Sequence, residues 1–98
     1  MTALELLSPA KNLECGIAAI DHGADAVYIG ATRFGARAAA DNPVEDIRKL
    51  CEYAHQYDAK VYVTINTLLY DSEIDDAVTL CREVHKAGAD AILIQDLN

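Results

Sequence analysis

The sequence predicts an α/β fold, a parallel β-α-β-α-β-α-β half of a (β/α)₈ barrel of the TIM type. Two observations lead to this prediction. Four short apolar runs alternate with segments of helical periodicity, in a unit of roughly 30 residues. Residues 23–29 also recur as residues 88–94, with five of seven positions identical. Four strands make half of such a barrel, and the alternative is an open flavodoxin-like sheet.

Each strand is expected where an apolar run meets turn residues, and each helix where apolar residues recur at helical spacing. The strands are expected at residues 4–7, 26–29, 60–66 and 91–94, and the helices at residues 12–22, 42–57 and 72–88. The middle helix has the clearest beginning. Asn42 suits the N-cap, Pro43 suits the first helical position, and Glu45 follows the cap by three residues.

One apolar stripe on each helix predicts the core that covers the sheet. The predicted stripes are Leu13, Ile17 and Ile20; Ile47, Leu50, Cys51 and Ala54; and Ile74, Ala77, Val78, Cys81 and Val84. A sheet of four strands still leaves its first and last strands as open edges and the inner face of the half barrel uncovered. We therefore expect residues 1–98 to be one segment, the N-terminal part of a longer protein, or to associate with a second copy.

Composition narrows the class of protein. Hydrophobic residues make up 52% and charged residues 24%, as in a folded globular chain. No apolar run reaches the roughly 20 residues of a membrane helix, and no secretory signal begins the sequence. Three cysteines without paired spacing favour reduced thiols, so we expect a cytoplasmic protein. The net charge of −8 argues against general binding of nucleic acid or anionic membranes.

Ligands of parallel α/β folds bind at the carboxyl ends of the strands. Polar residues that follow the strands there are Lys11, Asn12, Arg33, Arg37, Asn66, Gln95 and Asp96. Three of the eight basic residues lie in these segments, so an anionic ligand is one interpretation. The other is that Arg33 and Arg37 form ion pairs with Asp41, Asp71 or Asp96 and only hold loops together.

The remaining reactive side chains have structural explanations. His22, His55 and His85, with Asp25, Asp58 and Asp90, lie where helices end and strands begin, at the opposite end of the sheet. The cysteines lie one on each helix, without the spacing of a metal site, and Cys51 and Cys81 fall on apolar stripes. No nucleophile with a base and an orienting group can be assembled, so the catalytic residues are unknown.

Several segments resemble the N-terminus of the collagenase-like proteases, peptidase family U-thirty-two, whose catalytic type is unassigned. The matching segments are residues 6–14, residues 23–30 followed by Arg33-Phe34 and Arg37, residues 63–69, and residues 95–97. The resemblance implies a cytoplasmic protein with a (β/α)₈-like barrel, of which this chain is the first half. It also adds Tyr28, so that the candidate binding residues are Lys11, Asn12, Tyr28, Arg33, Phe34, Arg37, Asn66, Gln95 and Asp96.

The same resemblance implies two functions, and a third alternative does not depend on it. The family name implies a peptidase or collagenase, of which this segment would be an inactive part. Other members support hydroxylation of bases in tRNA or rRNA, in which Arg33 and Arg37 would hold an anionic ligand and Phe34 would stack on a base. The third alternative is a non-catalytic assembly fragment. Several members bind an iron–sulfur cluster, but its cysteines lie beyond this segment, so no cofactor or metal is expected here. The full-length protein would act on RNA or on a peptide.

Overall fold

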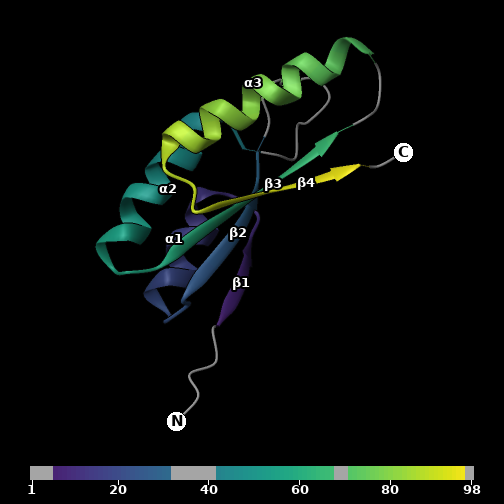
Figure 1. The fold of residues 1–98 in the computed structure, drawn as a ribbon. Coiled ribbons are helices and arrows are strands. Elements are labelled where there is room, and N and C mark those ends of the chain that lie inside the picture. The colour runs from purple at the N-terminus through teal and green to yellow at the C-terminus, as the bar shows by residue number, and fades with distance from the viewer. Residues whose placement is uncertain (1–5, 32–41, 68–70, 97–98) are drawn as a thin grey trace.

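The computed structural model describes residues 6–31, 42–67 and 71–96. For residues 66, 67, 71–77, 95 and 96 it describes the backbone alone. Strands and helices alternate along these described residues (Figure 1). The elements are β1 (Leu7–Ala10), α1 (Leu13–Asp21), β2 (Ala26–Gly30), α2 (Val44–Gln56), β3 (Lys60–Thr67), α3 (Asp71–Ala87) and β4 (Ala91–Asp96). The predicted parallel α/β fold is confirmed.

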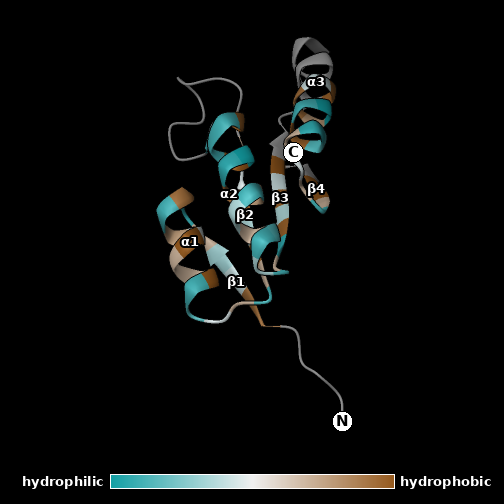
Figure 2. Cartoon of the chain, turned by 90° about the vertical axis from the view of Figure 1, so that its left-hand side faces the viewer, coloured by the Kyte–Doolittle hydropathy of each residue, from teal (hydrophilic) through white to brown (hydrophobic). Residues whose placement is uncertain are grey.

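All strand pairs are parallel, and the strands lie in the order β1-β2-β3-β4. A flavodoxin-like sheet has its first strand between the second and third, so that alternative is wrong for the described strands. The three helices lie together on one face of the sheet (Figures 1 and 2). Sequential order with one-sided helices is the arrangement found in each part of a (β/α)₈ barrel.

The core lies between this helical layer and the sheet. Alternate residues of the central strands point toward the helices, and Val27, Ile29, Val61 and Val63 are buried there. The predicted stripe of α2 is confirmed, since all four of its residues are buried: Ile47, Leu50, Cys51 and Ala54. In α1, Ile20 is buried while Leu13 and Ile17 pack against the core from its margin.

The predicted stripe of α3 is partly wrong. Val84 is buried, but Val78 is 47% exposed, and the buried side chains next to Val84 are Leu80 and Ala87. Positions 80, 84 and 87 follow the i, i+4, i+7 spacing of a helix face that packs on β3 and β4. The predicted Ile74 and Ala77 lie among the side chains that are not described.

Strand β1 lies three residues later than predicted, at Leu7–Ala10 instead of residues 4–7. It includes Ser8 and Pro9, which the sequence suggested as the end of the strand. The backbone oxygen of Leu6 accepts a hydrogen bond from Ala26 N, so Leu6 bonds toward β2. In a parallel strand every second residue bonds the same neighbour, so Ser8 also bonds toward β2, whereas Pro9 faces the outer edge of the sheet. Proline is tolerated on such an edge because β2 needs no hydrogen bond from it.

The sequence repeat corresponds to a repeated hydrogen-bond pattern. Leu6 N donates to Asp25 Oδ2 at 2.8 Å, and Asp25 N donates to Leu6 O at 2.9 Å. The same reciprocal pair joins Val61 and Asp90, with both distances 2.8 Å. Asp90 also contacts His55 Nε2 at 2.9 Å. Asp25 and Asp90 thus join the amino-terminal ends of neighbouring strands, and His55 connects the end of α2 to Asp90 before β4. These contacts are structural, as expected, but they are made across strands and not to a helix dipole.

All three helices end in the same way. After each helix comes a residue with positive φ, and these are Gly23 (99°), Asp58 (60°) and Gly88 (112°). The next N–H bonds back into the last turn of the helix, as from Ala24 to Ala19 O and from Ala59 to Ala54 O. This is the Schellman motif, in which glycine is the usual residue. Asp58 therefore corresponds to Gly23 and Gly88, and not to Asp25 and Asp90 as the sequence comparison suggested.

Replacing Asp58 with glycine should stabilise the chain. A residue with a Cβ is strained in the left-handed region, so we expect Asp58→Gly to raise the free energy of unfolding by roughly 0.5–1 kcal/mol. Urea denaturation measures this change. Gly23→Ala is the matched control, because no neighbour lies within 4 Å of the added Cβ and the change tests φ alone. It should lower stability by about 1 kcal/mol. A loss of stability in Asp58→Gly would contradict the assignment.

The two outer strands differ as surfaces for association. On the β1 edge, Pro9 has no N–H to donate to a further strand. On β4, the apolar side chains of Leu93 and Ile94 are 51% and 61% exposed. Exposed apolar residues on an unprotected edge strand promote pairing with another chain. The β4 edge is therefore the side at which a further strand would add.

We expect the 98-residue chain to self-associate through the β4 edge at micromolar concentration. Ile94→Lys should shift the chain toward monomer, because a charged side chain on an edge strand opposes pairing. Leu7→Lys is the control, since Leu7 is similarly exposed but lies on β1 beside Pro9. Sedimentation velocity measures both variants. A monomeric wild-type chain, or equal effects of the two substitutions, would refute this expectation.

Candidate functional site

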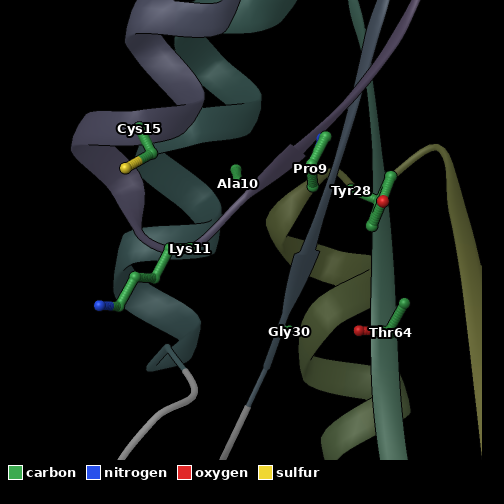
Figure 3. Close-up of a pocket in the computed structure, with 7 residues that line it drawn as sticks. All are labelled: Pro9, Ala10, Lys11, Cys15, Tyr28, Gly30 and Thr64. Carbon is green, nitrogen blue, oxygen red and sulfur yellow. The ribbon is translucent and has the colours of Figure 1, made fainter.

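The carboxyl ends of the first three strands surround a pocket of about 440 Å³. Figure 3 shows the residues that line it: Pro9, Ala10, Lys11, Cys15, Tyr28, Gly30 and Thr64. Strand register places several of them side by side, because Pro9 pairs with Tyr28 and Gly30 pairs with Thr64. The pocket therefore lies where ligands bind in parallel α/β folds.

Two of the predicted binding residues, Lys11 and Asn12, lie between β1 and α1. Lys11 lines the pocket, but its ammonium group points away from Tyr28 and Thr64 (Figure 3). Asn12 is the N-cap of α1, and its Oδ1 accepts from Cys15 N at 2.8 Å. The Asn12 oxygen is thus used to cap the helix, which leaves only its amide nitrogen to donate to a ligand.

Tyr28 lies on the sheet face opposite the helices and is 37% exposed. Its neighbours in the chain, Val27 and Ile29, point to the other face and are buried. In register, Tyr28 pairs with Tyr62, which is half-buried. Of the sequence-predicted candidates, Tyr28 and Lys11 are the two that the structure places in the lining of the pocket.

Asn42 is a residue of this region that the sequence interpretation misassigned. Its side chain is buried, and Nδ2 donates to Lys11 O at 3.1 Å and to Gly30 O at 3.0 Å. It does not cap α2, because Pro43 is the N-cap and no side chain bonds the first turn. Asn42 instead joins the carboxyl ends of β1 and β2 beside the pocket. In the sequence, a polar residue directly before a helix indicates an N-cap. That Asn42 instead bonds two strand ends becomes visible only in the folded chain.

Loss of the Asn42 amide should destabilise the fold at the pocket. We expect Asn42→Ala to lower the free energy of unfolding by about 1–3 kcal/mol, since the partly buried hydrogen bonds to Lys11 O and Gly30 O are lost. Asn42→Asp should cost more, because a carboxylate faces the same two carbonyl oxygens. Urea denaturation measures both variants, and Asn12→Ala, which removes only a helix cap, should cost about 1 kcal/mol. An Asn42→Asp variant as stable as wild type would contradict the arrangement.

The other predicted site residues are only partly placed. Arg33, Phe34 and Arg37 lie outside the described residues. The two ends of that segment lie together, since Ala31 bridges to Asn42 and Asn42 N donates to Gly30 O. In the backbone register, Asn66 pairs with Gln95 and Thr67 with Asp96, so Asn66, Gln95 and Asp96 lie at the carboxyl ends of β3 and β4.

The three cysteines differ in their surroundings. Burial raises the pKa of the Cys51 thiol to about 12, so this thiol stays protonated. Cys81 is half-buried, and Cys15 is exposed at the pocket. Within residues 6–31, 42–67 and 71–96, no three His, Cys, Asp or Glu side chains gather as metal ligands would. Cysteines on three separate helices do not fit an iron–sulfur cluster.

The structure thus defines a parallel α/β protein with its candidate binding site at the carboxyl ends of the strands. Among the described helices, none has the length and apolar character to cross a membrane. The chain belongs to Peptidase family U32, whose pattern matches residues 11–98. The family resemblance seen in the sequence is therefore confirmed.

Relatives in this family carry two kinds of name. The chain is 49% identical over 94 residues to the 23S rRNA 5-hydroxycytidine C2501 synthase of Escherichia coli (strain K12), and covers 14% of that protein. It is 39% identical to the tRNA hydroxylation protein P1 of Bacillus subtilis (strain 168), over 94% of the chain and 22% of that protein. It is 34% identical to the collagenase of Porphyromonas gingivalis (strain ATCC BAA-308 / W83), over 95% of the chain and 23% of that protein. The chain thus spans less than a quarter of each of these relatives.

Proposed function

We propose that this chain is the first half of the barrel of an RNA base-hydroxylation protein. The observation that carries the proposal is the 49% identity to the rRNA hydroxycytidine synthase, over 96% of the chain. The tRNA hydroxylation protein at 39% identity supports it further. The collagenase is less similar, at 34% identity. These similarities favour the alternative of RNA modification over the peptidase that the family name first implied.

The chemistry of the described residues supports the same choice. Peptide hydrolysis needs an activated nucleophile or an activated water molecule. Cys51 has a raised pKa, and Ser8 lies within β1. His55 binds Asp90 at the amino-terminal end of the strands, the end opposite the pocket. Cys15 is the described thiol that lines the pocket, and the described lining contains no histidine or carboxylate that could act as its base.

The proposal gives this segment a binding role. The pocket at the ends of β1–β3 and the N-terminus of α1 would receive part of the RNA, with Lys11 beside its phosphates. Arg33 and Arg37, on the segment between Ala31 and Asn42, would hold an anionic group there. The remaining strands of the barrel, from the rest of a longer chain or from a second copy, would supply the opposite wall. Any iron–sulfur cluster would take its ligands from outside this segment.

Deletion of the gene tests the proposal. We expect a deletion strain to lose one hydroxylated nucleoside from rRNA or tRNA, measured by mass spectrometry of nuclease digests, and to regain it with the gene on a plasmid. Casein and gelatin cleavage by the purified protein is measured alongside. An unchanged set of nucleosides in the deletion strain would refute the RNA function, and cleavage above that of a mock-purified control would favour the peptidase.

A further inference from the structure

The face of the sheet opposite the helices carries a pair of tyrosines. Tyr28 on β2 and Tyr62 on β3 are partners in the register, and Pro9 on β1 lies next to Tyr28 in the same row. Residues at paired positions of neighbouring parallel strands point to the same side of the sheet. Pro9, Tyr28 and Thr64 lie together across β1–β3, whereas Lys11 and Cys15 lie on the side of α1 (Figure 3). One row of the sheet thus carries two tyrosines and a proline.

The charge on this face differs from that of the chain as a whole. The chain has 16 acidic and 8 basic residues. The described side chains of this face are those of Leu7, Pro9, Ala26, Tyr28, Lys60, Tyr62, Thr64, Ala91 and Leu93. None of them is acidic, and Lys60 is basic. The nearest row toward the carboxyl ends contains Gly30 and Thr64, which border the pocket. A polyanion that approaches this face therefore meets no described carboxylate on it.

We propose that Tyr28, which lines the pocket, and its register partner Tyr62 form a platform on which a nucleobase of an RNA substrate stacks. The inference rests on the proposed RNA function and deepens it by naming where the base binds. Enzymes that modify a base must take it out of the helical stack, and aromatic side chains hold such bases by their faces. Tyr28 is more than a third exposed and reaches the pocket, so it contacts the base, and Thr64 beside it offers a hydroxyl group to the base edge.

Binding of two RNA probes by the purified protein tests the platform. One probe is a fluorescent RNA hairpin with a single unpaired cytidine, and the other is the same hairpin with an abasic site at that nucleotide. We expect Tyr28→Leu to weaken binding of the first hairpin by roughly 5- to 150-fold, which is the range for loss of one stacked base. Binding of the abasic hairpin should not change. Tyr28→Phe keeps the ring and should bind both hairpins within about twofold of wild type.

Tyr57→Leu is the matched control, because Tyr57 is a 60% exposed tyrosine at the end of α2, away from this face. It should leave binding of both hairpins unchanged, and thermal melting verifies that each variant is folded. Equal binding of the two hairpins by wild type, or equal effects of the Leu substitutions at positions 28 and 57, would overturn the proposal. A Tyr28→Leu variant that loses self-association but still distinguishes the hairpins would assign the face to a second copy instead.

The deletion strain separates this inference from the proposed function. If the nucleoside is lost on deletion but restored in full by a Tyr28→Leu gene that still distinguishes the hairpins, the function stands and the platform is wrong. If deletion changes no nucleoside while Tyr28→Leu abolishes the discrimination between hairpins, the platform stands and hydroxylation is wrong.

Discussion

The one-sided attachment of the helices is the constraint on which the structure depends. Parallel strands joined in sequence require crossover helices, and right-handed crossovers place every helix on the same face of the sheet. That face becomes the core, where Val27, Val63 and the stripe of α2 are buried. The opposite face then keeps whatever side chains remain, and here these include Tyr28 and Leu93, both exposed. The candidate site is a consequence of the same asymmetry, since the pocket opens beside this uncovered face.

Periodicity predicted the parts of the fold in which packing follows sequence spacing. The stripe of α2 is correct because all four residues face one buried surface. Prediction failed where hydrogen bonding across strands decides the structure. The apolar run before Ser8 suggested a strand that ended there, but the Asp25 carboxylate binds Leu6 N, and the paired residues begin at Leu7. Proline then lies inside the strand, because the outer edge does not need its N–H.

The candidate site was predicted in position more than in detail. The rule that ligands bind at the carboxyl ends of strands led to Lys11, which lines the pocket, and the family resemblance added Tyr28. The rule concerns ligands and so could not reveal that the Asn12 oxygen caps α1, which is a local contact with Cys15 N. It could not reveal that Asn42 joins two strand ends either, because that role depends on contacts with Lys11 and Gly30 from other parts of the chain. Tyr62 was missed because a tyrosine within a strand becomes a candidate only when register places it beside Tyr28.

The carboxylate clasps of Asp25 and Asp90 have a consequence for how such a fold is assembled. Each clasp fastens one pair of strands, β1 with β2 and β3 with β4, whereas Lys60 stands where the β2–β3 junction would need a third. The module that repeats is thus a pair of parallel strands, and the aspartate of each pair helps to hold its register. The described sheet is then two such pairs in tandem, and each pair contains its complete clasp.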